Sequence, residues 1–162
     1  MEKFVVHGGI PLSGSITPSG NKNEALPVLA ATLLAQEPVI LHNVPDILDI
    51  TIMRGLLESL GVEVKQIDKH SFSFDPGNLK SANPDSTQAS RIRGSFLLAG
   101  PLLARKKSIV LPAPGGDRIG LRPVQTHLSA LEKLGTRIDL NENGFYQMQT
   151  SGLKGTQIYL DE

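Results

Sequence analysis

The sequence predicts an α+β fold built from two successive copies of one unit, each a helix, a strand, a second helix and a β-hairpin. Apolar residues recur at helical spacing and then alternate at strand spacing, twice in the same order. Leu-Leu-Ala at 33–35 returns at 102–104, and Leu-Gly at 60–61 returns at 134–135. With 40% hydrophobic and 20% charged residues among 162, the composition is that of a globular protein able to bury a core.

The first copy has four expected elements, whose ends are marked by residues with strong local preferences. They are a helix at 23–36, a strand at 39–44, a helix at 47–60 and a hairpin formed by 62–67 and 71–74. Proline is tolerated only in the first turn of a helix, so Pro27 requires the first helix to begin near residues 22–24. Asp46 is the expected N-cap of the second helix, and Gly61 stands just past its end.

The second copy repeats this order. Its elements are a helix at 90–105, a strand at 108–111, a helix at 123–134 and two strands at 136–140 and 145–149, which flank Gly144. Apolar residues spaced by three and four positions fall on one face of the first of these helices. Pro123 suits the first position of the second helix, and Gly135 suits the position just past its end.

The connection at 112–123, PAPGGDRIGLRP, is longer than the corresponding part of the first copy. Its three prolines stiffen the chain, and its three glycines allow sharp changes of direction. Ordinary connections have about two to six residues, and long loops of this composition are often lids or binding loops. We therefore expect this loop to carry function.

The ends of the chain are expected to extend the repeat. Residues 3–7 and 14–18 read as short strands, and 152–156 resembles 11–15 and precedes the strand-like 157–160, as if a third copy began. Repeated units bury their apolar faces against one another, so two units leave one face uncovered. We expect an incomplete fold, either a fragment or a chain that needs a partner.

Composition and charge argue against several classes of protein. Sixteen Lys and Arg balance sixteen Asp and Glu, so nothing global favours a nucleic acid or an acidic membrane as partner. Without cysteine there is no disulfide or thiolate metal site, and the four histidines lack ligand spacing, so we expect neither metal nor cofactor. No apolar stretch is long enough to span a bilayer and no signal peptide is evident, which favours the cytoplasm.

Cationic side chains lie at the expected starts of three helices. Lys22 and Asn23 begin the first helix, where free backbone N–H groups and the positive dipole end favour an anion. The alternative is that asparagine simply caps the helix and Lys22 is solvated. Arg91 and Arg93 fall in the first turn of the helix at 90–105, either as anion ligands or as ordinary exposed arginines.

The third start follows the loop. Arg122 directly precedes the helix at 123–134, Arg118 and Asp117 lie within the loop, and His127 faces the same helix end. An aspartate after two glycines is otherwise common turn chemistry. Three helix starts that all carry cations point to a phosphate-rich ligand bound by this chain.

Three stretches together resemble the N-terminal part of the UDP-N-acetylglucosamine 1-carboxyvinyltransferases, within the enolpyruvyl transferase family. They are GNKNEALPVLAATLLA, RGSFLLAGPLLAR and PGGDRIGLRPVQTHLSALEKLG. The resemblance implies two lobes of repeated β-α-β-α-β-β units with buried helices and outward-facing sheets, an inside-out α/β barrel that is incomplete here. It assigns residues 1–21 to strands of the second lobe and 22–162 to the first lobe, with two repeats and the start of a third.

The resemblance also implies an activity. The enolpyruvyl group of phosphoenolpyruvate passes to the 3-hydroxyl of UDP-N-acetylglucosamine, the step that opens peptidoglycan synthesis. Lys22 and Asn23 match the pair that binds phosphoenolpyruvate, and Arg93 matches a contact to the sugar nucleotide. The stretch that binds the UDP-sugar corresponds to Arg122, Pro123, Val124, Gln125 and Thr126.

Asp117 stands where most family members carry a loop cysteine that acts as general acid. Family variants with aspartate at this position are insensitive to fosfomycin, which alkylates the cysteine. The resemblance therefore implies that Asp117 delivers a proton to C3 of phosphoenolpyruvate while the sugar hydroxyl adds to C2. Phosphate then leaves the adduct.

Two positions depart from the family pattern. Gln125 replaces a common aspartate, and Glu162 stands where many members have lysine. The second-lobe aspartate that would accept the hydroxyl proton lies outside these 162 residues, so we expect little or no turnover from this chain without the remainder of the protein. The alternatives are a non-catalytic sugar-nucleotide-binding paralogue or module, and 3-phosphoshikimate 1-carboxyvinyltransferase.

Overall fold

The computed structural model describes residues 3–116 and 123–160. The first unit contains α1 (Lys22–Ala31), the short 3-10 helix η1 (Thr32–Leu34), β1 (Val39–Leu41), α2 (Leu48–Leu60), β2 (Glu63–Asp68) and β3 (Ser71–Asp75). The second contains α3 (Ser86–Ala89), the 3-10 helix η2 (Arg93–Leu98), α4 (Ala99–Lys106), β4 (Ser108–Pro112), α5 (Gln125–Lys133), β5 (Thr136–Leu140) and β6 (Phe145–Thr150). The α+β class and the repeated order of elements are therefore confirmed.

The two sheets have the same topology. The strand orders are β1-β3-β2 and β4-β6-β5, and all neighbouring strands are antiparallel. In both sheets the second strand of the hairpin, β3 or β6, lies in the centre. It pairs on one side with the first hairpin strand and on the other with the single strand that precedes the second helix, β1 or β4. The hairpin at Asp68 is closed by the backbone N–H of His70, which donates to the Asp68 carboxylate at 2.8 Å and lowers its pKa.

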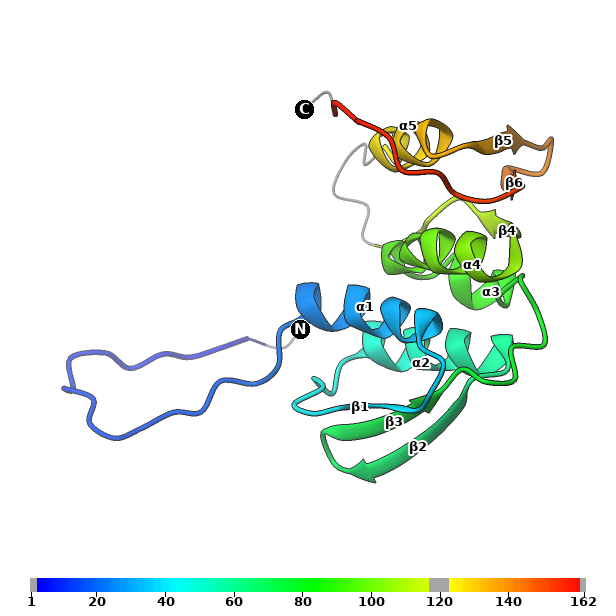
Figure 1. The fold of residues 1–162 in the computed structure, drawn as a ribbon. Helices are drawn as coiled ribbons and strands as arrows, with labels where there is room; N and C mark the ends of the chain where they lie inside the picture. Colours follow the sequence, from blue (N-terminus) through cyan, green and yellow to red (C-terminus); the bar gives the residue numbers. More distant parts are fainter. Residues whose placement is uncertain (1–2, 117–122, 161–162) are drawn as a thin grey trace.

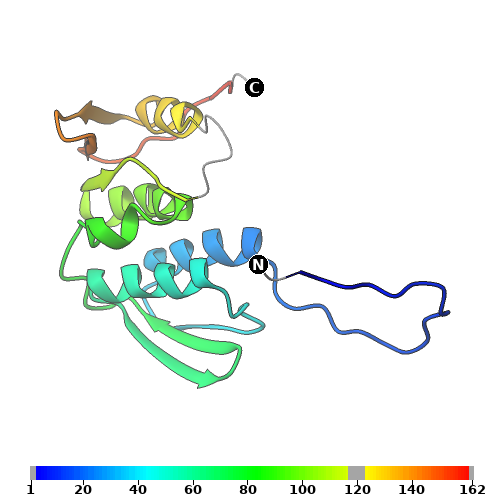
Figure 2. The ribbon, with the colours of Figure 1, turned by 180° about the vertical axis from the view of Figure 1, so that it is seen from behind.

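Helices of the two units pack against one another and form the centre of the core. Figures 1 and 2 show α1 and α2 between the first sheet and the helices of the second unit. α1 contacts both α2 and η2, and α4 contacts η1. Leu29, Leu57, Leu98 and Leu102 in these helices are fully buried. In the central strand β3, Phe72 and Phe74 are buried whereas Ser73 and Asp75 are only half-buried, so the first sheet has one face toward the helices and one toward solvent.

The prediction of one continuous helix at 90–105 is wrong. The chain forms α3, turns at residues 90–92, and then continues through η2 into α4; Ile92 is extended, with φ −130° and ψ 142°. The buried Ser95 hydroxyl donates to the carbonyl oxygens of Ala89 and Ile92, at 2.7 and 2.8 Å. These bonds satisfy backbone groups at the break, a use of serine that competes with regular helix.

Several helix ends differ from the sequence expectation. α2 begins at Leu48, and its N-cap residue is Ile47, so Asp46 is not the cap. α5 begins at Gln125 after Val124, so Pro123 precedes the helix instead of opening it. A helix can begin without a side-chain cap when tertiary packing supplies most of its stability.

Other expected ends are confirmed. Asn21 caps α1, because its carboxamide oxygen accepts the Asn23 backbone N–H at 2.7 Å. Gly61 and Gly135 adopt positive φ, +101° and +95°, where they follow α2 and α5. The C-terminal end of α1 is an exception, because this helix is shorter than expected and passes into η1, which ends at Leu34.

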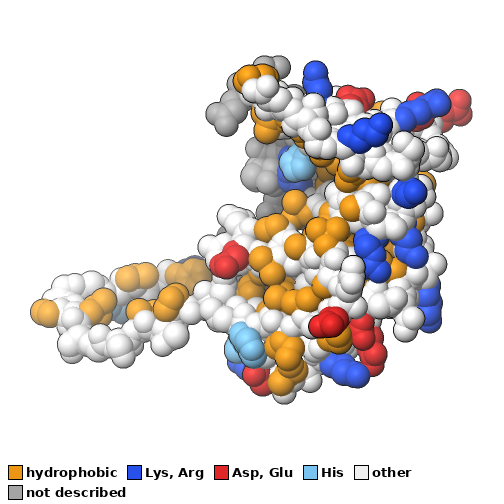
Figure 3. All heavy atoms as spheres, viewed as in Figure 1, with side chains coloured by type: hydrophobic (Ala, Val, Ile, Leu, Met, Phe, Trp, Pro, Cys, Tyr) orange, Lys and Arg blue, Asp and Glu red, His pale blue; other side chains and the backbone are white. Residues whose placement is uncertain are grey.

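The strands expected at 3–7, 14–18 and 157–160 are not formed in the described part of the chain. Residues 3–19 make an extended, exposed arm that leaves the body of the molecule (Figure 1). Apolar side chains follow this arm (Figure 3), among them Phe4, at 101% of its reference exposure. A strand needs a neighbour for its hydrogen bonds, and no sheet of the described residues offers one here.

Arg105 joins the two units through the backbone. Its guanidinium, on α4, donates to the carbonyl oxygens of Leu33 at 2.7 Å and Ala35 at 3.0 Å, where η1 ends. Arg105→Met is expected to lower the free energy of unfolding by about 1–2 kcal/mol, because these charged hydrogen bonds are lost at a partly exposed site. Urea denaturation measures the change. Lys133→Met, also in the last turn of a helix, is the control and should change stability by less than about 0.5 kcal/mol.

Candidate functional site

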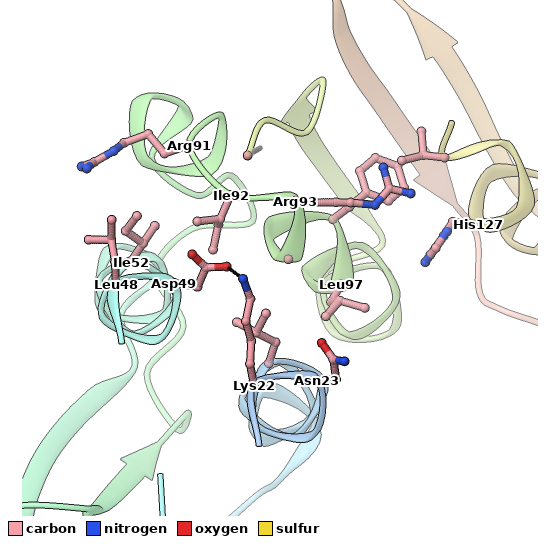
Figure 4. Close-up of a pocket in the computed structure, with 15 residues that line it drawn as sticks. Lys22, Asn23, Leu48, Asp49, Ile52, Arg91, Ile92, Arg93, Leu97 and His127 are labelled. Carbon is pink, nitrogen blue, oxygen red and sulfur yellow. Dashed lines mark ion pairs between the residues drawn. The ribbon is translucent and has the colours of Figure 1, made fainter. Parts of the chain in front are cut away.

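A pocket of about 510 Å³ opens where α1, α2, η2 and α5 begin. Figure 4 shows the residues that line it. Its polar members come from four separate parts of the chain: Lys22, Asn23, Asp49, Arg91, Arg93 and His127. Apolar side chains, with Leu26, Ile52 and Phe96 among them, form the rest of the wall. The structure therefore brings Lys22, Asn23 and Arg93, which are far apart in the sequence, to one cavity.

Lys22 and Asn23 reach the pocket because α1 begins at its edge. The Asn21 cap fixes the first turn, and Lys22 is the first residue of the helix. Leu26 and Leu29, both buried, hold the same helix against the core. The capping reading of asparagine is thus correct, and the same helix start also presents Lys22 to a cavity.

Asp49 is a member of the site that the sequence did not reveal. Its carboxylate, in the first turn of α2, forms an ion pair with the Lys22 ammonium. Figure 4 shows the two side chains pointing toward one another. The only sequence signal was an acidic residue near a helix start, and that is common because it suits the helix dipole.

The structure separates the two arginines of the second motif. Arg93 is half-buried and donates from its guanidinium Nη2 to the carbonyl oxygen of Pro123 at 2.9 Å. Arg93 therefore connects the start of η2 to the residue that precedes α5. Arg91 is exposed, and in Figure 4 its side chain extends away from Lys22 and Arg93.

The stretch around the start of α5 contributes to the pocket in part. Val124 is buried and lines it, and Pro123 adjoins it through its bond with Arg93. Gln125 and Thr126 are exposed on α5 and are not among the described residues that line the cavity. His127 does line it and packs edge-on against Phe96, with 5.9 Å between ring centroids.

Glycine is required where the chain of 113–116 approaches the site. A Cβ atom on Gly115 would overlap the carbonyl oxygen of Ser90. Gly116 has a φ of +100° and lines the pocket. Asp117, Arg118 and Arg122 lie outside the described residues, so their roles stay predictions.

The charges in the pocket suit an anionic ligand. Among the described residues that line it, Lys22 and Arg93 are cations and Asp49 is a carboxylate, whereas Arg91 borders the cavity with its side chain extending away from the other two cations. Cations that converge on a partly enclosed cavity raise the local concentration of anions and bind phosphate and carboxylate groups. Within 3–116 and 123–160, no group of three or more His, Asp or Glu side chains could hold a metal ion. Over the same ranges, no helix has the length and apolarity needed to cross a membrane.

Comparison with known proteins gives a consistent result. A family model described as EPSP synthase (3-phosphoshikimate 1-carboxyvinyltransferase) matches residues 6–162. A UDP-N-acetylglucosamine 1-carboxyvinyltransferase of Treponema denticola is 43% identical over 162 residues, which is all of this chain and 38% of that protein. One of Bradyrhizobium diazoefficiens is 42% identical over 160 residues, or 99% of this chain and 37% of its own length.

Solved structures agree with these relationships. The enolpyruvyl transferase NikO from Streptomyces tendae superposes with a TM-score of 0.76 at 26% identity, covering 91% of this chain and 32% of its own. EPSP synthase from Acinetobacter baumannii gives a TM-score of 0.67 at 21% identity, over 90% of this chain and 34% of its own, and this shows the fold alone. The chain thus spans slightly more than a third of the length of the curated relatives that it matches.

Proposed function

Because this chain belongs to the enolpyruvyl transferase family, which the matching EPSP synthase model describes, we propose that it forms part of an enzyme that makes enolpyruvyl-UDP-N-acetylglucosamine. The donor is phosphoenolpyruvate, and the acceptor is the 3-hydroxyl of UDP-N-acetylglucosamine. The name shared by relatives at 42–43% identity supports this choice of acceptor. The observation that carries the proposal is that Lys22, Asn23, Arg93 and Val124 line one and the same cavity.

In this proposal Lys22 and Asn23 bind phosphoenolpyruvate at the start of α1. The donor carries a phosphate and a carboxylate, and an ammonium at the N-terminus of a helix can stabilise either group. Arg93 and the stretch from Arg122 to Thr126 hold the sugar nucleotide. The bond between Arg93 and the Pro123 carbonyl supports this role, since it links the two sugar-binding segments.

The reaction has two steps. The sugar 3-hydroxyl gives its proton to the second-lobe aspartate and its oxygen bonds to C2 of phosphoenolpyruvate, while C3 takes a proton from the Asp117 carboxylic acid. The tetrahedral adduct then returns a proton from C3 to the Asp117 carboxylate and the C2–O bond to phosphate breaks, which restores the double bond and releases inorganic phosphate. Lys22 and the arginines stabilise the charge that develops on the phosphate as that bond breaks.

The same proposal assigns the rest of the fold. Residues 22–162 form most of one lobe, an incomplete inside-out α/β barrel, and residues 1–21 belong to a second lobe formed by the remainder of the protein. The exposed apolar side chains of the arm at 3–19 support this assignment, because a monomeric surface rarely presents so many in one segment. Turnover then requires both lobes. A cytoplasmic location and insensitivity to fosfomycin stay predictions.

A second acceptor is supported by a specific observation, since the matching family model bears the name of the shikimate enzyme. Calorimetry with UDP-N-acetylglucosamine and, separately, with shikimate 3-phosphate distinguishes the two acceptors. Phosphate release by the complete protein, with phosphoenolpyruvate and either acceptor, distinguishes an enzyme from a binding module. Phosphate release with shikimate 3-phosphate alone would contradict the proposed acceptor, and binding without release in the complete protein would contradict the proposed activity.

The two arginines give a matched test of the site. Arg93→Ala is expected to weaken binding of UDP-N-acetylglucosamine about tenfold, because it removes a cation that faces the pocket and the bond to Pro123. Arg91→Ala, two residues away and directed outward, should change the affinity less than about twofold. Titration calorimetry gives both values. Equal losses in the two variants would show that the arginines act only through general positive charge.

A further inference from the structure

The ion pair between Lys22 and Asp49 lies inside the pocket, and its exposure indicates a role other than stabilising the fold. The Lys22 side chain is 47% exposed and that of Asp49 is 28% exposed. Ion pairs at such exposure add little to stability, since water screens them and two side chains must be ordered. The ion pair therefore contributes little to the free energy of unfolding, and its main effect is on the position of the Lys22 ammonium.

The Lys22 side chain needs an interaction that holds it in one conformation. A lysine side chain has four rotatable bonds and loses considerable entropy when it is held in one conformation. The start of α1 carries the positive end of the helix dipole, which repels the ammonium and favours conformations that point to bulk solvent. A fixed anion on the opposite wall counters both effects.

Asp49 has the properties of such an anchor. It lies in the first turn of α2, where a carboxylate is favoured by the helix dipole. The neighbouring Ile50 and Ile52 are 2% and 6% exposed, so the turn that carries Asp49 is held against the core. Since α1 contacts α2 directly, the carboxylate is presented at a constant position to the ammonium of Lys22.

The pairing also leaves Lys22 able to bind a ligand. An ammonium has three N–H donors, and its pairing with Asp49 is made to a single carboxylate oxygen, Oδ2. Figure 4 shows Lys22 rising from α1 toward Asp49, with Arg93 on the far wall extending toward α5. The remaining N–H donors of the Lys22 ammonium can therefore be offered to an anion in the pocket.

We propose that Asp49 is a positioning residue, which holds the Lys22 ammonium in the pocket so that it meets the phosphate or carboxylate of the donor. This inference rests on the proposed function for the identity of the ligand. It assigns a role to a residue outside the binding motif. It also makes a signed claim: removal of the negative charge weakens anion binding, although simple electrostatics in an anion site would predict the opposite.

The test combines a direct view of Lys22 with ligand affinity. In protein labelled with ¹⁵N-lysine, the NMR signal of the Lys22 side-chain nitrogen, identified by its loss in Lys22→Ala, reports on the pairing. Calorimetry with phosphoenolpyruvate reports on the function. The variants are Asp49→Ala, Asp49→Asn and Asp49→Glu. Glu24→Gln is the matched control, because Glu24 is an exposed carboxylate in the first turn of α1 that faces a different, smaller cavity.

We expect Asp49→Ala and Asp49→Asn to shift the Lys22 signal and to weaken phosphoenolpyruvate binding about tenfold, the size of effect usual for coupled neighbours. Asp49→Glu should recover part of both, and Glu24→Gln should change neither. In the Lys22→Ala background, Asp49→Ala should no longer weaken binding and should instead recover part of the affinity, because Asp49 helps binding only through Lys22 and otherwise repels the anion.

Three results would overturn the inference. They are an unchanged Lys22 signal in Asp49→Asn, an affinity that stays constant or rises when the charge is removed, and an equal loss with and without Lys22. Failure of the proposed function gives a separate result, in which the wild-type protein does not bind phosphoenolpyruvate at all. The Lys22 signal in Asp49→Asn then still decides whether the carboxylate holds the ammonium.

Discussion

Replacing Lys22 by alanine is expected to weaken the binding of phosphoenolpyruvate by about 100-fold. The substitution removes the cation at the start of α1 and leaves the Asp49 carboxylate without its partner in the same cavity. An approaching anion then loses a charged hydrogen bond and meets an exposed negative charge. Truncating one member of a charge pair in a binding site typically costs about 2–5 kcal/mol, which corresponds to a factor of 30 or more.

Titration calorimetry with phosphoenolpyruvate measures this loss. Lys65→Ala is the matched control, because Lys65 also pairs with a carboxylate, that of Glu63 at 2.8 Å, but on the exposed strand β2. It should leave the affinity unchanged. Lys22→Arg keeps the charge with a different geometry and should retain part of the binding. If Lys22→Ala bound phosphoenolpyruvate with wild-type affinity, the proposal that this pocket binds the donor would be wrong.

The largest effect on stability is expected at Phe96, on η2. Its side chain is 4% exposed and packs edge-on against two rings, those of His127 on α5 and Tyr146 on β6. Phe96→Ala should lower the free energy of unfolding by about 3–5 kcal/mol, because it leaves a cavity and removes both ring contacts. Since Phe96 also lines the pocket, the loss should loosen the placement of α5 beside it.

Urea denaturation measures the change at Phe96. Phe4→Ala makes the same substitution on the exposed arm and should change the free energy of unfolding by less than about 0.5 kcal/mol. Phe96→Leu, which fills most of the space, should cost less than the alanine variant. Similar values for the alanine variants at positions 96 and 4 would show that the second unit does not depend on this ring cluster.

Local chemistry explains why much of the fold was readable in the sequence. Gly61 and Gly135 end helices because a left-handed backbone conformation favours glycine wherever it occurs. The hairpins follow from alternating residues and short turns, and the repeat follows from the recurrence of these local patterns. Lys22, Asn23 and Arg93 were named from motifs and the resemblance, and the structure places all three at one pocket. Their roles in binding stay predictions.

Secondary structure is predicted wrongly from the sequence where distant residues decide the local conformation. The helix pattern at 90–105 was genuine, but the chain breaks at Ile92, where the buried Ser95 hydroxyl bonds two carbonyl groups. The arm at 3–19 has strand-like sequence but no neighbour among the described residues to pair with. Periodicity records the preference of a segment, whereas its conformation also depends on the partners that the fold supplies.

The sequence by itself determined the two α+β units, the ends of several helices and the presence of cations at helix starts, because each depends on residues close together in the chain. Only the tertiary structure decided that α1 and α2 begin side by side, which pairs Lys22 with Asp49, and that Arg93 turns inward while Arg91 turns out. These features depend on how helices pack, and packing distances between residues far apart in the chain are not written in any local pattern.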